Sequence, residues 1–300
     1  MLLLGRSWGN VEQIYQYAKA YLGEDTRAAQ QFLPNCSGKR AKFLSHRIRS
    51  RQKGKWSFVR RLLMLRLDFE KYNQNQRLKN KLLSTGNRHL IENSPADPFW
   101  GPPGNEAGKI LMRLRSYFNN NYDSLPSVLM IGDSLLKLVS EKHVSNRLGA
   151  KTECISVPGA KLQYVFYALK FLTGEYLRKV VVCVGTNNIS TKRNTACKGP
   201  KQILKSVQRC ILEFCTENPR CELFVTQILN RPRNEHDRIA SHLLRYNDML
   251  LKAHADGLFP VNCKIIEIQP LDKQYFSDGL HLNGGGTTIF VNNLIKIVNS

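Results

Sequence analysis

The residues of the second half that could carry chemistry stand directly after apolar stretches of sequence. Gly132-Asp133-Ser134 follows the apolar run 128–131, and a helical pattern begins at once beyond it. A sharp strand-to-helix turn of this kind exposes a serine hydroxyl beside the free N–H groups of the helix start. The same three residues also suit an ordinary turn, in which glycine permits the bend and Asp or Ser caps the helix. The turn alone therefore leaves both interpretations open.

Three further turns of this kind follow later apolar stretches. They are Pro158-Gly159-Ala160, then Gly185-Thr186-Asn187-Asn188, and finally Ser277-Asp278-Gly279-Leu280-His281. Each has a structural explanation by itself, because Gly, Asn and Asp are common turn and cap residues. Taken with Ser134, they supply a nucleophile, a base with an acid three residues before it, and two oxyanion donors. We therefore expect one catalytic site built from all four turns.

The elements that position these turns alternate along the chain. Strands are expected at 127–131, 153–157, 179–184, 222–228 and 264–268. Helices are expected at 135–146, 162–172, 201–217, 235–255 and 287–298. Nearly continuous apolar strands separated by amphipathic helices predict a parallel sheet covered on both faces, an α/β three-layer sandwich. The site of such a sheet lies at the carboxyl ends of its strands, where the four turns fall.

This set of residues resembles the SGNH (GDSL-type) hydrolase superfamily over 125–300, with Ser134, Gly159, Asn187 and His281 in the family order. The resemblance implies a flavodoxin-like parallel sheet. It further implies that His281 takes the proton of Ser134, that Asp278 orients His281, and that Ser134, Gly159 and Asn187 form the oxyanion hole. The implied reaction is cleavage of an ester through an acyl-enzyme, with no metal and no cofactor.

The first 118 residues have a different pattern, dominated by helical periodicity. Helices are expected at 11–22, 56–65, 77–83 and 108–115, and a short strand at 90–92. In the first helix, Glu12, Gln16 and Lys19 share one face, as charged surface stripes also do. The basic stretch between the helices expected at 11–22 and 56–65 is expected to be looped, and 93–105 is rich in turn residues.

Several separated motifs in this part resemble the NADAR family. They are VEQIYQYAK from residue 11, Trp56, LLSTGNRHLIE from residue 82, DPFWG from residue 97 and NEAGKILMRLR from residue 105. The resemblance implies cleavage of N-glycosidic bonds to ribose, in riboflavin-pathway intermediates or in ADP-ribose attached to a base. Family members carry a strand and turn before the first helix, for which this chain has only residues 1–10. We therefore expect an N-terminally truncated domain.

The implied NADAR site consists of Glu12, Lys19, Trp56, Asp97 and Trp100. A carboxylate there can stabilise an oxocarbenium-like sugar or activate water. A lysine of lowered pKa can attack an opened ribose to form an imine, and two tryptophans can sandwich a base.

Composition indicates a globular protein with a strong basic excess. There are 45 Lys and Arg against 23 Asp and Glu, a net charge of +22, and the segment 39–61 holds no acid. This charge favours binding to nucleic acid. No apolar run reaches the roughly 20 residues of a membrane span. Eight cysteines form no C-x-x-C pair. We expect an intracellular protein, cytoplasmic or nuclear, with no membrane partner.

Three functional hypotheses follow for a chain with a NADAR-like domain at 1–118, a linker at 119–126 and an SGNH-like domain at 127–300. The leading one is a serine hydrolase acting on a small-molecule ester. The second is an N-glycosidase that removes ADP-ribose or another ribosyl group from a base through Glu12 and Lys19. The third is a catalytically inactive, basic nucleic-acid-binding protein.

Overall fold

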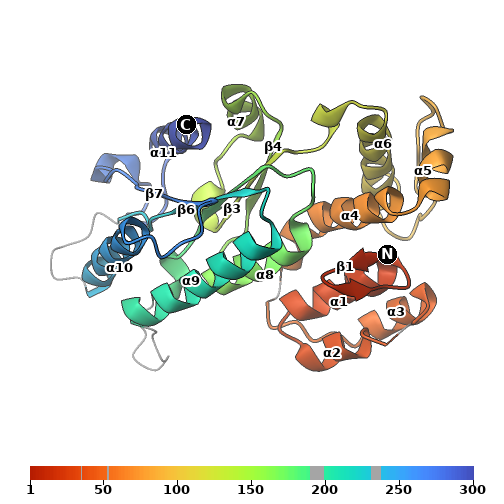
Figure 1. The fold of residues 1–300 in the computed structure, drawn as a ribbon, viewed down its shortest axis with the longest axis horizontal. Helices are drawn as coiled ribbons and strands as arrows, with labels where there is room; N and C mark the ends of the chain where they lie inside the picture. Colours follow the sequence, from red (N-terminus) through yellow and green to blue (C-terminus); the bar gives the residue numbers. More distant parts are fainter. Residues whose placement is uncertain (35, 53, 190–198, 231–237) are drawn as a thin grey trace. The chain divides into compact units, whose positions relative to one another are not determined.

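The computed structural model describes the whole chain except residues 35, 53, 190–198 and 231–237. The chain divides into two compact units (Figure 1). The first unit is Met1–Leu125 with Lys170–Gly174, and the second is Pro126–Leu169 with Glu175–Ser300. The first three residues of the helix expected at 235–255 lie outside the described residues. Of the helices in the described ranges, none combines the length and apolar character needed to cross a lipid bilayer.

The first unit is mainly helical, as expected. A two-stranded antiparallel hairpin, β1 (Leu2–Leu3) and β2 (Arg6–Ser7), precedes the helices. The helices are α1 (Val11–Leu22), α2 (Thr26–Gln31), α3 (Gly38–Ser45), α4 (Trp56–Asn73), α5 (Gln76–Leu83) and α6 (Glu106–Phe118), followed by the 3₁₀ turn η1 (Tyr122–Ser124). The bounds of α1 coincide with the predicted 11–22.

The start of α1 is fixed by side chains that satisfy backbone groups. Asn10 caps the helix, and its Oδ1 accepts a hydrogen bond from the Gln13 amide at 2.9 Å. The buried Gln13 side chain donates to the carbonyl oxygens of Phe32 at 2.8 Å and Pro34 at 3.0 Å. These bonds hold the segment after α2 against α1, because a buried amide without partners would be costly.

Two local predictions for this unit were wrong. The basic segment contains α3, which Ser37 caps at its start and whose Ala41 and Leu44 are buried in a small core cluster. The Lys and Arg residues of α3 obscure this short apolar face in the sequence. Residues 90–92 form no strand, because the Asn105 side chain takes their backbone groups instead. Asn105 Nδ2 donates to the Leu90 carbonyl, and its Oδ1 accepts from the Glu92 amide, both at 2.9 Å.

The second unit is built on one five-stranded parallel sheet, as expected. The strands are β3 (Val128–Gly132), β4 (Thr152–Ser156), β5 (Lys179–Cys183), β6 (Glu222–Thr226) and β7 (Cys263–Ile266), in the order β4-β3-β5-β6-β7. All neighbouring strands are parallel. Every residue of β3 is buried, which fits the position of that strand between β4 and β5.

Helices cover both faces of this sheet and make three layers (Figure 1). The helices are α7 (Glu141–Leu148), α8 (Leu162–Leu172), α9 (Pro200–Glu217), α10 (Arg238–Ala255) and α11 (Gly284–Asn299), with 3₁₀ turns η2 (Ser134–Leu136), η3 (Thr186–Asn188) and η4 (Lys273–Tyr275). Met130, Val181 and Phe224 of the sheet share one hydrophobic cluster with Val144 of α7 and Phe290 of α11. In Figure 1, α8, α9 and α10 lie on the opposite face.

The helix expected at 135–146 is interrupted. The chain instead forms η2, leaves helical structure, and starts α7 at Glu141. Asp133 accepts a hydrogen bond from the Leu135 amide at 3.0 Å, and Ser140 accepts one from the His143 amide at 3.3 Å. Each of these residues caps a separate helical segment, which explains the break.

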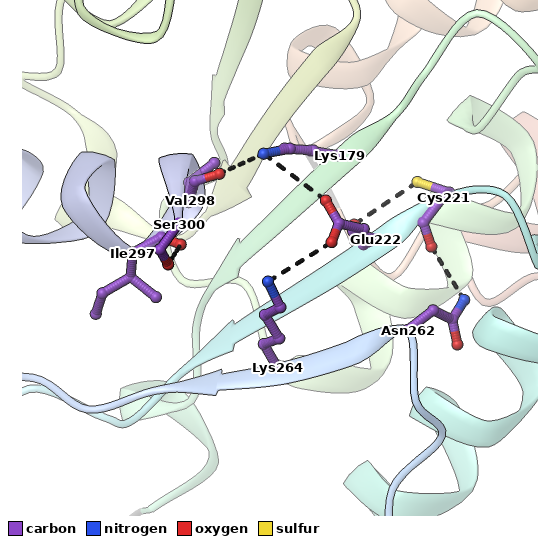
Figure 2. Close-up of polar contacts among 8 residues, drawn as sticks. All are labelled: Lys179, Cys221, Glu222, Asn262, Lys264, Ile297, Val298 and Ser300. Carbon is purple, nitrogen blue, oxygen red and sulfur yellow. Dashed lines mark hydrogen bonds and ion pairs between the residues drawn. The ribbon is translucent and has the colours of Figure 1, made fainter.

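The amino ends of the strands are joined by charged groups (Figure 2). Glu222 lies between Lys179, at 3.7 Å, and Lys264, at 3.6 Å. Lys179 also donates a hydrogen bond to the carbonyl oxygen of Val298 near the end of α11. The Lys179 contact holds the C-terminal end of α11 at the amino edge of the sheet, opposite the edge at which the four predicted site turns follow the strands.

Candidate active sites in the two units

In the second unit, hydrogen bonds connect the turns that follow β3, β4 and β5. Asn187, in η3 after β5, donates from Nδ2 to the Asp133 carboxylate at 3.1 Å and to the Ala160 carbonyl at 3.0 Å. Asp133 is buried beside Ser134, and Ala160 follows Gly159. The structure therefore brings the turns of Ser134, Gly159 and Asn187 together at the carboxyl ends of adjacent strands.

These two hydrogen bonds also limit how the Asn187 side-chain amide could bind an oxyanion. Its two N–H donors both have protein acceptors, so an oxyanion would have to share or replace one of them. The Ala160 carbonyl is a neutral acceptor, and a charged oxyanion is a stronger one. The arrangement thus holds the Asn187 side chain in one orientation and leaves exchange of a single hydrogen bond as the way to receive an oxyanion.

His281 and Asp278 form a close pair in the loop before α11. His281 Nδ1 lies 2.7 Å from Asp278 Oδ2, and Asp278 Oδ1 accepts from the amides of His281 at 2.7 Å and Leu280 at 2.9 Å. The hydrogen bond with the His281 ring and the two amide bonds hold the pKa of the Asp278 carboxyl well below its usual range. Asp278 is therefore charged and orients the imidazole through Nδ1.

Packing relates this loop to the serine turn, although the two side chains are not bonded. Leu136 of η2 belongs to the same hydrophobic cluster as Phe276 and Leu282, which flank the Asp278–His281 loop and form a β-bridge. Ser134 and His281, both within the described part of the chain, have no hydrogen bond to each other. The structure thus joins three of the four turns by hydrogen bonds and the fourth through the hydrophobic core.

In the first unit, a cavity of about 540 Å³ gathers the implied NADAR residues. All five line it: Glu12, Lys19, Trp56, Asp97 and Trp100. Residues of α1 and α4 form most of the cavity wall. Glu12, Gln16 and Lys19 of α1 line it. The lining residues of α4 are spaced four positions apart, so they lie on one face of that helix.

Sequence reasoning missed several cavity residues on that face of α4. Arg60, Met64 and Asp68 follow Trp56 at intervals of four and all line the cavity. Burial raises the pKa of the Asp68 carboxyl to about 6, Lys71 opposes the rise and Glu92 adds to it. The i+4 spacing from Trp56 was the available signal, but it also fits a helix that packs on its neighbours.

The aromatic residues of the cavity contact one another. The Tyr15 ring lies edge-on to Trp56 at 4.9 Å between centroids and to Trp100 at 6.0 Å. Tyr15 is buried, and this burial raises the pKa of its phenol. Both tryptophans thus give part of their surface to Tyr15, and Trp100 also contacts the Phe99 ring, at 4.7 Å between centroids.

The DPFWG motif shapes the loop that carries Trp100. Asp97 Oδ1 accepts hydrogen bonds from the amides of Phe99 and Trp100, both at 3.1 Å. One carboxylate oxygen of Asp97 therefore holds the turn, although the side chain lines the cavity. The later NEAGK motif acts similarly, because a Cβ at Gly108 would clash with the Leu90 carbonyl that Asn105 holds. These two motifs position the cavity-lining loop between Glu92 and Trp100.

Comparison with solved structures finds hydrolases that cover the C-terminal part of the chain. An acetyl xylan esterase is 16% identical, covering 57% of this chain and 98% of its own, with a TM-score of 0.47. A lipase/acylhydrolase from Enterococcus faecalis is 17% identical, covering 58% of this chain and 96% of its own, with a TM-score of 0.44.

Sequence comparison concerns the first unit. A riboflavin biosynthesis protein of Vibrio vulnificus is 34% identical over 116 residues, 37% of this chain but only 31% of that protein. An N-glycosidase of Nostoc punctiforme is 30% identical over 119 residues, 38% of this chain and 76% of that protein. The NADAR domain family matches residues 3–119, and through this domain the chain belongs to the NADAR family.

Proposed function

We propose that the first unit hydrolyses an N-glycosidic bond between a ribosyl group and a base. The observation that carries this proposal is the single cavity lined by Glu12, Lys19, Trp56, Asp97 and Trp100. The name of the relative from Nostoc punctiforme, an N-glycosidase, supports the same reaction class. We place this function ahead of ester hydrolysis because Ser134 and His281 lack the hydrogen bond that the serine mechanism needs.

The chemistry follows from two side chains of α1. Glu12 and Lys19 are seven residues apart, about 10 Å along the helix axis, so they approach a bound sugar from different positions. The Glu12 carboxylate stabilises positive charge on the anomeric carbon as the C–N bond breaks, or activates the attacking water. The base nitrogen keeps the bonding electrons and takes a proton, and the water oxygen bonds to the anomeric carbon. Alternatively, the Lys19 amine adds to C1 of the ring-opened riboside, the base leaves C1 with the bonding electrons and a proton, and water then hydrolyses the imine that remains on Lys19.

The test is release of free ribosyl product from ADP-ribosylated DNA and from related N-ribosides. We expect turnover by the parent chain and a loss of about 100-fold or more in Glu12→Gln, a typical effect of removing an acid–base or electrostatic group. Lys19→Ala distinguishes the two mechanisms, because only the imine mechanism requires its amine. Glu106→Gln, an acid of α6 outside this cavity, is the matched control. A folded parent that releases nothing from any of these substrates refutes the proposal.

We propose a second function, hydrolysis of a small-molecule ester by the second unit. The specific observation in favour is the 2.7 Å contact between His281 Nδ1 and Asp278, which leaves Nε2 as the basic nitrogen. In this mechanism His281 takes the Ser134 proton as Oγ bonds to the ester carbonyl carbon. The alcohol then leaves with that proton, and water releases the acid from the serine.

A fluorophosphonate probe tests the second function, because it forms a covalent bond only with an activated serine. We expect labelling of the parent chain, no labelling of Ser134→Ala, and unchanged labelling of Ser57→Ala, an exposed serine of the first unit. Asp278→Asn should label much more slowly, since the imidazole loses its orienting carboxylate. An unlabelled parent with a folded second unit rules out this activity.

A further inference from the structure

Asp68 is a buried carboxyl group on the wall of the cavity in the first unit. The residue is only 8% exposed, and it lines the cavity on the same face of α4 as Arg60 and Met64. Its ion-pair partner Lys71 lies 3.9 Å away, beyond the length of a hydrogen bond. No hydrogen bond to the Asp68 side chain is present among the described residues, so its oxygens are available to a ligand in the cavity.

Contacts of Lys71 place Asp68 at the same end of the cavity as Glu12. Glu12 and Lys71 line this cavity and also a second one, of about 530 Å³, beside α1 and α4. These two residues therefore lie where the two cavities adjoin, and the ion pair with Lys71 brings Asp68 to the same place. A ligand in the first cavity is thus bordered by carboxyl groups from two helices.

The surroundings of these two carboxyl groups differ. Glu12 accepts a hydrogen bond from Gln16 Nε2 at 2.9 Å, and Asp68 has no such donor among the described residues. Burial raises the pKa of the Asp68 carboxyl to about 6, against the attraction of Lys71 and with a smaller contribution from Glu92. Two carboxyl groups in such different environments can divide the work of an acid and of a charged carboxylate.

We propose that Asp68 is the catalytic acid that protonates the base as it leaves the sugar. The proposal rests on the N-glycosidase function and names the source of the proton in that reaction. The Asp68 O–H gives its proton to the base nitrogen, which keeps the electrons of the broken C–N bond. The water oxygen bonds to the anomeric carbon, and the Glu12 carboxylate accepts the proton that this water loses. Solvent then removes that proton from Glu12 and returns one to Asp68.

The test is the pH dependence of kcat/KM for ADP-ribosylated DNA, or for the related N-riboside that the parent chain hydrolyses fastest. We expect the parent to lose about 10-fold for each pH unit above about 6, where Asp68 gives up its proton. Asp68→Asn should be about 100-fold slower than the parent at about pH 5.5 and should lack this decline. The two proteins should become equal near pH 8, because neither then carries the proton.

The groups that face Asp68 provide a second measurement. Lys71→Met should move the decline to higher pH and Glu92→Gln to lower pH, because the first removes an attraction for the carboxylate and the second a repulsion. Tyr72, one turn further along α4, also faces Asp68, and burial raises the pKa of its phenol, so it stays protonated over this range. Glu106→Gln, outside the cavity, is the control and should keep the profile of the parent.

The ratio of parent to variant separates catalysis from structure. A purely structural role of Asp68 lowers kcat/KM by the same factor at every pH, and that result overturns the proposal. An Asp68→Asn variant as active as the parent at about pH 5.5 overturns it too, as do shifts of the Lys71 and Glu92 variants in one direction. Asp68→Glu keeps an acid at this position and should restore the decline with pH. A parent that hydrolyses no N-riboside refutes the N-glycosidase function itself, whereas turnover with a constant ratio refutes this inference alone.

Discussion

Asp68 makes a quantitative prediction, because its carboxyl is buried on the cavity wall at a cost to the folded state. Burial raises its pKa from 3.8 to about 6, so the folded protein holds the proton more tightly than the unfolded chain. At about 1.4 kcal/mol for each pKa unit, the charged carboxylate costs the folded state about 3 kcal/mol above pH 6. This destabilisation is absent below pH 4, where both states are protonated.

Asp68→Asn removes the charge and keeps the shape, so it should stabilise the first unit at pH 8. The pKa of about 6 already includes the opposing effect of Lys71, 3.9 Å away. We therefore expect a net gain of about 3 kcal/mol in the free energy of unfolding. The gain should shrink as the pH falls through 6 and vanish near pH 4.

The assay is urea unfolding followed by tryptophan fluorescence at a series of pH values. The three tryptophans, Trp8, Trp56 and Trp100, all belong to the first unit, so the signal reports that unit even if the second unfolds separately. Asp123→Asn, an exposed acid of the same unit, is the control and should change little. An Asp68→Asn variant no more stable than the parent at pH 8, or one whose gain grows toward pH 4, would refute this account.

Three other perturbations test the packing and the surface. Asn105→Ala should destabilise the first unit by about 2–4 kcal/mol in the same fluorescence assay, because the Leu90 carbonyl and the Glu92 amide both lose their hydrogen-bond partner. Unchanged stability would contradict the role given to these two hydrogen bonds. Gly185→Ala should lower the melting temperature of the second unit, measured by circular dichroism, since φ at this position is +146° and a Cβ would lie 2.6 Å from the Ile228 side chain. Gly199→Ala is the control and should not lower it, because a Cβ there meets no atom within 4 Å. Phe43, 61% exposed with the Arg47 guanidinium 5.4 Å from its ring centroid, lies in the basic segment. We expect single-stranded oligonucleotides to bind with a steep salt dependence and Phe43→Ala to weaken binding about 5-fold or more, as loss of a stacking platform does; a parent that fails to bind at low salt excludes this partner.

Regular periodicity accounts for what could be predicted of the fold. The helices α1 and α8 have the bounds expected from apolar residues at helical spacing, and the five strands fall within two residues of their expected bounds. Each helix buries one face over several turns, and each strand is largely buried over several residues. The pattern therefore repeats often enough to be recognised without knowledge of the neighbours.

The errors occur where a single side chain or a short face decides the structure. The helix α3 buries only Ala41 and Leu44, too few apolar residues to stand out among the cations around them. Residues 90–92 join no sheet, because the Leu90 carbonyl and the Glu92 amide bond to Asn105, 13 residues or more along the chain. Such bonds depend on tertiary contacts that no local pattern contains.

The candidate sites divide in the same way. Glu12 and Lys19 could be singled out because their spacing places them on one helix face beside recognisable motifs. Arg60 and Asp68 could not, since charged residues at multiples of four positions after Trp56 are equally typical of a solvated helix face. These residues of α4 line a cavity only because α1 packs against α4. The relation of Ser134 to His281 likewise depends on loops 147 residues apart in the sequence.

The strand order β4-β3-β5-β6-β7 has a consequence for the chain as it is synthesised. The helices α1 to α6 of the first unit are complete at Phe118, whereas the sheet needs Ile266 for its last strand. At 5–20 residues per second, these roughly 150 residues occupy the ribosome for about 7–30 seconds. During that interval β3 emerges before both strands that pair with it, so the apolar segment leading to Ser134 is exposed first and covered late. Until β5 is synthesised, β3 can pair only with β4.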